Sequence, residues 1–488
     1  MERNVYELLG HPLAMGIFVL TLFLPVIVGL FASRRTKNQA DFFVGGRSMN
    51  AFVVGLSAVS TGRSAWLVLG LSGVAYTSGV GAVWAIVGYI LVEAWQFYYL
   101  GRRLRRQSQK FNSITLLDYF TSRFNDRSNL LRITGVFIIG LFITAYVAAQ
   151  FNAGSKALST AMNLSVEVSL AIAGLLIMIY MVLGGYVAVA FNDVLRAIIM
   201  LVGLVTLPVF LVFQIGGWEV FWDMLQQLSP ALVDPWALGL GVIIGFVGIG
   251  LGSPGQPQIV VRYMSIAKEE NLKYSAILGT FWNLMLGLGA ICIGLAGRVL
   301  VPDVNQLPGS DPEMIYLAMS AEYFGPAIYG LLLGGVFAAI LSTADSQLLV
   351  VASTFACDLY EKVMKPKASF SEKERLTISR IVVVLAGIIA LVLAYFAQEL
   401  VFWLVLFAWG GLGAAFGPSL ILALFWKKTT KYGVFAGMVT GAVAVIAWRL
   451  WLREPTGVYE LIPAFLLGWL MVVLVSKATR ENPDAVAG

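Results

Sequence analysis

The stretch SAVSTGRSAWLVLG, residues 57–70, places a single arginine, Arg63, among small and apolar residues. A charged side chain near the centre of a bilayer is costly, and it is usually paired and functional. The segment therefore predicts a functional position inside a membrane domain, with a partner for Arg63 elsewhere in the chain.

Side-chain oxygens gather in a second apolar stretch, AAILSTADSQLL at residues 338–349. Hard cations such as sodium prefer hydroxyl, carbonyl and carboxylate oxygens. Hydroxyls in membrane helices also bond to their own backbone or to a neighbouring helix. The stretch therefore predicts either a cation site or a helix contact, formed by Ser342, Thr343, Asp345 and Ser346.

A third apolar stretch, VAFNDVLRA at residues 189–197, adds the acid Asp193 and the base Arg196. Asp193 and Asp345 could form a second ion site or a protonatable site. They could equally be ion-paired with Arg196 and Arg63. Spacing alone leaves these interpretations open.

The elements that carry these residues must be membrane helices. Hydrophobic residues make up 59% of the 488-residue chain and charged residues 12%, and the mean hydropathy is +0.83. Such values exclude an ordinary soluble domain. Both cysteines, Cys292 and Cys357, lie in apolar runs, so neither a disulfide framework nor a metal cluster is indicated.

Windows of about 20 apolar residues, the length that crosses the hydrocarbon layer, predict thirteen spans. We place them at about 13–33, 51–75, 80–100, 128–155, 167–184, 188–216, 238–262, 274–299, 326–359, 378–397, 400–426, 432–452 and 459–476.

Lysine and arginine alternate with acidic or neutral loops along these spans. Basic loops such as GRRLRRQSQK (101–110) alternate with acidic ones such as PDVNQLPGSDPE (302–313). The positive-inside rule then places the N-terminus outside the cell and the C-terminus in the cytoplasm. We expect the membrane to be a bacterial plasma membrane. We read the net charge of +6 as this orientation signal and not as nucleic-acid binding.

Two spans are interrupted near their middle. The seventh contains GLGSPGQPQ (250–258), where three glycines and two prolines oppose a continuous helix; the second contains STGRS (60–64). The breaks could be structural kinks. Their positions, however, fall in the first helix of each of two consecutive five-span groups, a pattern typical of transporters built from inverted repeats.

We therefore predict one membrane transport domain covering residues 1–488. Its fold class is an all-α polytopic membrane protein with a leucine-transporter-like inverted-repeat core. The parts are a peripheral helix at 13–33, a first repeat at 51–216, a second repeat at 238–426 and two peripheral helices at 432–476.

The chain resembles the solute:sodium symporter family, and within it the bacterial sodium/proline symporters. The resemblance extends over residues 30–476 and rests on six motifs: DFFVGGRS (41–48), LLDYFTSRF (116–124), GGYVAVAFND (184–193), GQPQIVVRYM (255–264), AAILSTADSQLLV (338–350) and AWGGLGAAFGP (408–418). It implies a ten-helix core with one helix before it and two after.

The resemblance also implies ion sites. Sodium would be the coupling ion, and no other cofactor is expected. The main site would use the carbonyls of Ser60, Arg63 and Ala339 with the hydroxyls of Ser342 and Thr343. A second cation position, found in some members, would involve Asp193, Ser342, Asp345 and Ser346.

The solute would lie against the two broken helices. The resemblance implies contacts from Ser64, Trp66, Tyr146, Ile249, Ser253, Gln256 and Pro257. Ile249 and Ser253 stand where proline symporters carry Trp and Tyr, which predicts a roomier pocket. The retained residues favour a small zwitterion, whereas these two replacements favour a larger solute.

Gly62-Arg63 replaces an Asp-Met pair of the proline symporters, so an acid important for sodium is absent. We expect Arg63 to point out of the ion site and to pair with Asp345 or with a carbonyl. The alternative is that the guanidinium stands in for sodium.

These observations predict a sodium-coupled symporter that imports a small organic solute, such as proline, by alternating access. The alternative is a proton-coupled or sodium-independent carrier of a larger solute. The lipid bilayer is a further expected partner, and nucleic acid is not expected to bind. We expect the monomer to be the functional unit. An enzyme is not indicated because no catalytic constellation is visible, and neither is a channel, since no filter is visible.

Overall fold

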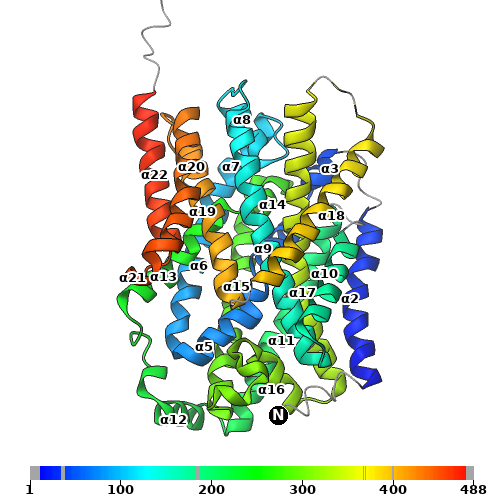
Figure 1. Cartoon of the computed structure of the whole chain (residues 1–488), viewed down its shortest axis with the longest axis vertical. Coiled ribbons are helices and arrows are strands. Elements are labelled where there is room, and N and C mark those ends of the chain that lie inside the picture. Colours follow the sequence, from blue (N-terminus) through cyan, green and yellow to red (C-terminus); the bar gives the residue numbers. More distant parts are fainter. Residues whose placement is uncertain are drawn as a thin grey trace, which may run out of the picture.

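The computed structural model describes residues 11–33, 39–181, 186–366, 368, 370–397 and 400–479. These residues form a bundle in which the long helices run roughly along one direction, while short helices such as α12 lie across it at one end (Figure 1). The first half contains α2 (Pro12–Ser33), α3 (Gln39–Val44), α4 (Ala51–Gly62), α5 (Ser72–Ser78), α6 (Val83–Trp95), α7 (Gly101–Lys110), α8 (Leu116–Arg123), α9 (Leu130–Met162), α10 (Val166–Met181) and α11 (Tyr186–Ile215).

The second half follows with a similar series. It contains α12 (Trp218–Leu228), α13 (Leu240–Gly248), α14 (Pro257–Ser265), α15 (Leu272–Leu300), α16 (Ile315–Tyr323), α17 (Pro326–Ala352), α18 (Glu372–Phe396), α19 (Val401–Phe425), α20 (Lys431–Ala447), α21 (Arg453–Thr456) and α22 (Leu461–Ala478).

The described helices confirm ten of the thirteen predicted spans as helices able to cross a membrane. Nine helical stretches are long and apolar enough to cross a membrane, and a bent pair makes a tenth. Shorter apolar helices at Pro12–Pro25, Ala51–Gly62 and Val166–Leu176 account for the remaining predicted positions. The chain is therefore a multi-pass membrane protein.

Both predicted helix breaks are present. Asn50 caps the start of α4 by accepting a hydrogen bond from Val53 N at 2.8 Å. The helix ends at Gly62, Arg63 leaves helical geometry with φ −113° and ψ 78°, and a wider π-helical turn resumes at Trp66–Leu71.

The second break lies between α13 and α14. The helix tightens into a 3₁₀ turn at Ile249–Gly255, Gln256 is extended, and the two halves meet at an angle of 54°. Pro257 begins α14, where its missing N–H costs nothing. Gly252 is required because any side chain there would overlap the indole of Trp409.

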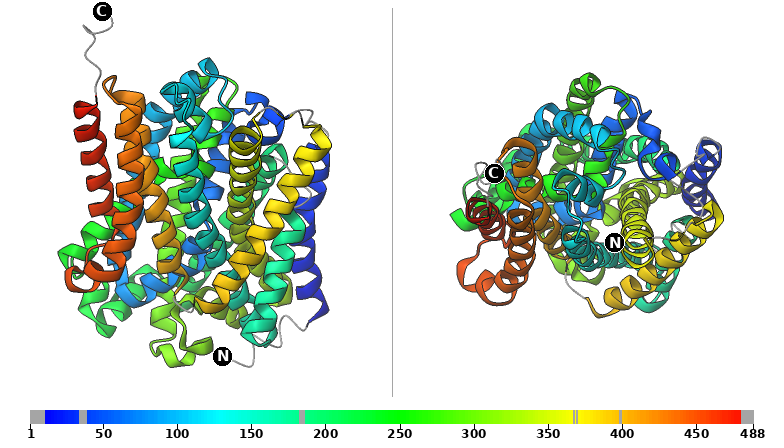
Figure 2. Two further views of the ribbon diagram at one scale, coloured as in Figure 1. Left: turned by 45° about the horizontal axis from the view of Figure 1, so that its top comes forward. Right: turned by 90° about the horizontal axis from the view of Figure 1, so that it is seen from above.

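The broken helices lie inside the bundle and the predicted peripheral helices lie outside it. α4 packs against α11, α14, α15 and α17, while the Ile249–Gly255 turn packs against α6 and α19. α2 and α22 occupy opposite edges of the molecule in Figure 1 and in the view from above in Figure 2.

Loop elements separate between the two ends of the bundle. α12 and α16, which belong to predicted outer loops, lie at the lower end of Figure 1 where α2 begins. α7 and α8, from a predicted inner loop, lie at the upper end, where α22 ends. This separation agrees with the loop pattern of the sequence.

Candidate functional site

The predicted sodium ligands meet where α4 ends beside α17. The Ser342 hydroxyl donates to Ser60 O at 3.0 Å and to Ala339 O at 3.1 Å. Thr343 donates its hydroxyl to Thr61 O at 3.0 Å. Four of the five predicted residues are thus gathered at one helix contact, and all four are buried.

Arg63, the fifth, follows directly at the break. Its backbone N–H donates to Val59 O at 3.0 Å and to Ser60 O at 3.3 Å, which closes the last turn of α4. Carbonyls freed at a broken helix, together with two hydroxyls, form a set of oxygens that suits sodium.

The predicted second cation position contains a guanidinium. Arg262 Nη2 donates to Asp193 Oδ2 at 3.1 Å and to Ser346 Oγ at 2.6 Å. The same Asp193 oxygen accepts from Ser57 at 2.7 Å and from Thr61 at 3.1 Å. Asp193 and Ser346 are therefore close together, with a protein cation between them.

Asp345 is bonded elsewhere, and the expected pair with Arg63 is wrong. Arg196 Nη1 lies 2.5 Å from Asp345 Oδ2, and both side chains are buried. One residue along a helix is about 100° around its axis, so Ser346 faces α4 while Asp345 faces α11. Of the interpretations that spacing left open, the structure has ion pairs, with Arg262 as the partner of Asp193.

Arg63 points toward α6 and α15 and not toward α17. Its Nε donates to Asn283 Oδ1 at 2.7 Å, and Asn283 Nδ2 donates in turn to Glu93 Oε2. The guanidinium carbon lies 3.4 Å from the centre of the Tyr89 ring and 5.7 Å from that of Trp66. Arg63 itself is 1% exposed.

Tyr89 also explains the missing acid at position 62. A side chain at Gly62 would overlap the hydroxyl of Tyr89, so the ring takes the space that a carboxylate would need. Sequence reasoning did not find Tyr89, Glu93, Asn283 or Arg262. Glu93 and Arg262 carried a usable signal, because each is a charged residue within an apolar span.

Aromatic rings connect the predicted solute residues. Trp66 stacks on Phe402 at 5.7 Å and on Tyr89 at 6.5 Å, and Tyr89 stacks on Trp409 at 5.6 Å. Trp409 Nε1 donates to Ile249 O at 2.8 Å. Tyr89 comes from α6, Phe402 and Trp409 come from α19, and Trp66 follows the first break, so aromatic surface lies beside both broken helices.

The other predicted solute residues adjoin this group. Gln256 Nε2 donates to Trp409 O at 2.9 Å, and Ser64 Oγ accepts from Trp66 N at 3.2 Å. Tyr146 lies next to Ser64 and Arg63, and Ser253 lies beside Tyr89.

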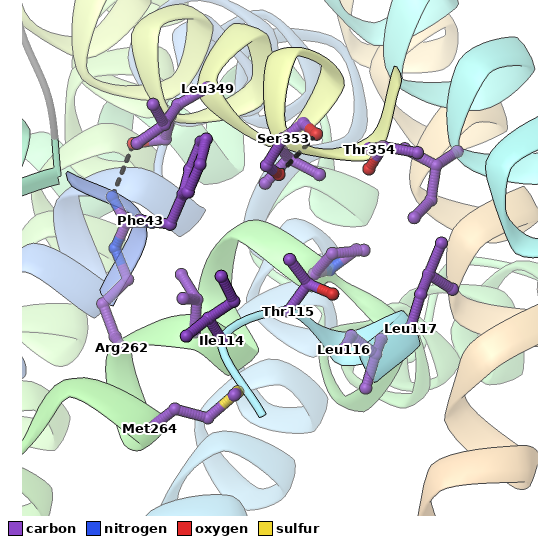
Figure 3. A pocket seen from close by; sticks show the side chains of 15 residues that line it. Phe43, Ile114, Thr115, Leu116, Leu117, Arg262, Met264, Leu349, Ser353 and Thr354 are labelled. Atoms are coloured by element: carbon purple, nitrogen blue, oxygen red, sulfur yellow. Dashed lines mark hydrogen bonds between the residues drawn. The ribbon is translucent and has the colours of Figure 1, made fainter. Parts of the chain in front are cut away.

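Pro257 is set apart from that group. It lines a pocket with Arg262 and Ser346, and Phe43 and Thr115 complete the walls. Figure 3 shows Arg262 reaching from α14 toward the helix that carries Leu349. The second-cation cluster therefore borders a pocket that also touches α3 and the start of α8.

Two broken helices, buried polar groups at the breaks and, among the described residues, up to ten helices long and apolar enough to cross a membrane define a secondary transporter of the inverted-repeat class. The Sodium:solute symporter family model matches residues 42–441. The chain belongs to this family, which is a family of transporters.

Named relatives agree with this assignment. The sodium/proline symporter of Staphylococcus aureus (strain JH9) is 34% identical over 471 residues, covering 93% of this chain and 91% of the relative. The same values hold for the sodium/proline symporter of strain NCTC 8325 / PS 47.

Solved structures show the same fold. A Na⁺-coupled sialic acid symporter in a substrate-bound outward-open state matches with a TM-score of 0.80 and 22% identity, over 96% of this chain and 97% of that one. A nucleobase-cation-symport-1 family transporter in a closed conformation matches with a TM-score of 0.55 and 14% identity, over 92% and 98%.

Proposed function

We propose that this protein imports a small organic solute together with sodium. The observation that carries the proposal is the junction of α4 and α17, where the Ser342 hydroxyl lies within hydrogen-bond distance of both Ser60 O and Ala339 O. An ion that bridges these helices stabilises one arrangement of the break and so raises solute affinity; by linkage, the solute raises sodium affinity equally.

The position of the Arg63 guanidinium supports sodium coupling over the alternative. A guanidinium that replaced sodium would have to reach the hydroxyls of Ser342 and Thr343. Instead it bonds to Asn283 and lies against Tyr89. The ion ligands on α17 are thus left to a mobile cation, and we assign proton-coupled or uncoupled transport the lower rank.

Proline is the first solute to test, because relatives that are 34% identical are named sodium/proline symporters. The second cation position, Asp193 with Asp345 and Ser346, is the weaker ion site, since both acids are held by arginines. We further propose that the protein acts as a monomer in the bacterial plasma membrane. Its C-terminus would lie in the cytoplasm, and it would need no cofactor besides the sodium ion.

Uptake into proteoliposomes tests this proposal. Radiolabelled proline and other amino acids are offered under an inward sodium gradient, a proton gradient, or neither. We expect Ser342→Ala to raise the sodium concentration for half-maximal uptake about tenfold, because it removes one oxygen from a charged site.

Ser379→Ala is the matched control, since within the described part of the chain the Ser379 hydroxyl bonds only to its own helix, at Arg375 O, 2.8 Å away on α18. Its sodium dependence should equal that of the wild type. Uptake that ignores sodium in the wild type would reject the proposal in favour of the uncoupled carrier.

A further inference from the structure

The cluster of Arg63, Asn283 and Glu93 is a buried charge site beside the first helix break. Arg63 comes from the end of α4, Glu93 from α6 and Asn283 from α15. All three side chains are buried, with Arg63 and Glu93 each 1% exposed. Three separate helices therefore bring one acid and one base to the same place.

Each charged group in this cluster uses only part of its bonding capacity. Arg63 Nε donates a hydrogen bond to Asn283, but Nη1 and Nη2 have no hydrogen-bond partner among the described residues. Glu93 spends Oε2 on Asn283, and Oε1 likewise has none there. Buried charged groups are rarely left in this condition, because an unmet donor or acceptor is costly.

The unmet groups are of complementary kinds. Two donors of the arginine fork match a carboxylate, which binds such a fork through both oxygens. The indole Nε1 of Trp66 is also buried and without a partner in the described part of the chain, and the centre of this ring lies 5.7 Å from the guanidinium carbon. The free carboxylate oxygen of Glu93 matches an ammonium group.

We propose that Arg63 and Glu93 recognise the two ends of a zwitterionic amino acid: the solute carboxylate binds Arg63 Nη1 and Nη2, and its primary or secondary ammonium group binds Glu93 Oε1. Asn283 is a positioning residue that orients both groups. This inference rests on the proposed function and adds to it the solute class and the residues that select it. The rings of Tyr89 and Trp66 bound the site with aromatic surface.

The first test uses the unaltered protein and three probes of similar size. L-proline carries both charges, L-prolinamide lacks the carboxylate, and cyclopentanecarboxylate lacks the amine. Binding is measured by competition with the best radiolabelled substrate from a panel of L-amino acids. We expect each analogue that lacks one charge to bind at least about tenfold more weakly than the zwitterion.

The second test changes the proposed binding residues of the protein. Arg63→Gln should weaken binding of the zwitterion at least about tenfold, and Arg63→Lys should fall between it and the wild type, because lysine keeps the charge without the fork. Glu93→Gln should weaken zwitterion binding while leaving cyclopentanecarboxylate unchanged, so that the preference between the two is lost.

Arg103→Gln is the control. Arg103 also lies over an aromatic ring, 4.1 Å from the Phe425 centroid, but it belongs to α7 and not to either broken helix. Its removal should leave all three affinities unchanged.

Equal binding of L-proline-type solutes and their amides, or unchanged affinity in a folded Arg63→Gln protein, would overturn the inference; so would a panel in which no amino acid binds. Sodium binding is measured separately, as the change in tryptophan fluorescence on adding sodium in the absence of solute. Choline serves as the control salt. A sodium response with no zwitterion preference contradicts only this inference, whereas its absence contradicts the proposed function.

Discussion

The two arginines nearest the helix breaks, Arg63 and Arg262, differ in how completely their bonds are met. Arg262 donates to Ser57 at 3.2 Å, to Ser346 at 2.6 Å, to Asp193 at 3.1 Å and to its own helix at Gln258 O. Arg63 makes one side-chain hydrogen bond, to Asn283, within the described residues.

The difference separates two uses of a buried charge. Arg262 ties α14 to α4, α11 and α17 and leaves little for a ligand to bind. Arg63 is held in place by one bond and two ring faces, and it keeps the outer atoms of its fork for something that arrives. A buried arginine by itself thus predicts only that the residue matters for structure or function. Side-chain nitrogens without a hydrogen-bond partner indicate that it binds a ligand.

Arg262→Gln should have the largest effect. Removing the base leaves Asp193 buried without its cation, which costs on the order of 3 kcal/mol of folding stability. Thermal unfolding of the purified protein, followed by circular dichroism, should show a lowered midpoint. Asp193→Asn in the same protein should restore part of the loss, because the pair is then removed from both sides; a double variant as unstable as the single one would refute this account.

Arg63→Gln should cost less stability, about 1 kcal/mol, since it loses one hydrogen bond and the ring contacts with Tyr89 and Trp66. The same unfolding measurement compares it directly with Arg262→Gln. A loss as large as that of Arg262→Gln would mean that Arg63 is a structural tie, and the contrast between the two arginines would fail.

The smallest effect concerns another ion-paired arginine, Arg132, near the start of α9. It lies 3.0 Å from Asp118 Oδ1, which Lys362 Nζ also approaches at 2.5 Å. Burial raises the pKa of Asp118, but Lys362 and Arg132 together outweigh it and hold this pKa below its ordinary value of 3.8.

An acid whose pKa is lower in the folded state adds stability above its unfolded pKa, and this stability is lost as the pH falls through the folded value. The contribution of Asp118 should therefore be present in full at neutral pH, begin to fall near the ordinary pKa of 3.8, and be lost as the pH drops further through the lowered folded pKa. Unfolding midpoints measured against pH should show a weaker acid dependence in Asp118→Asn than in the wild type. Identical profiles for the two proteins would contradict the assignment.

Several features of the fold could be predicted from residue patterns because they depend on local chain properties. Runs of about 20 apolar residues must be spans, and Gly-Pro clusters such as 250–258 must interrupt them. The contact between α4 and α17, through the oxygens of Ser342 and Thr343, was implied by the resemblance to the family and not by the residue pattern alone.

The partners of the charges could not be predicted in the same way. Asp345 was predicted as the partner of Arg63 because span 9 was expected to lie opposite the first break, whereas the structure pairs Asp345 with Arg196. Which charge meets which depends on how each helix is rotated about its axis and on where the chain turns at Arg63, with φ −113° and ψ 78°. Apolar spans without a strong polar face carry little information about either.

By itself, then, the sequence determined the class of protein, the positions of the spans and breaks, and the oxygen-rich stretch of α17, because hydropathy and backbone chemistry act within one segment. Only the tertiary structure decided that Tyr89 fills the space beside Gly62, that Arg262 lies between Asp193 and Ser346, and that Arg63 joins Glu93 through Asn283. Each of these contacts joins residues from different helices, and long-range packing, not local pattern, sets such distances.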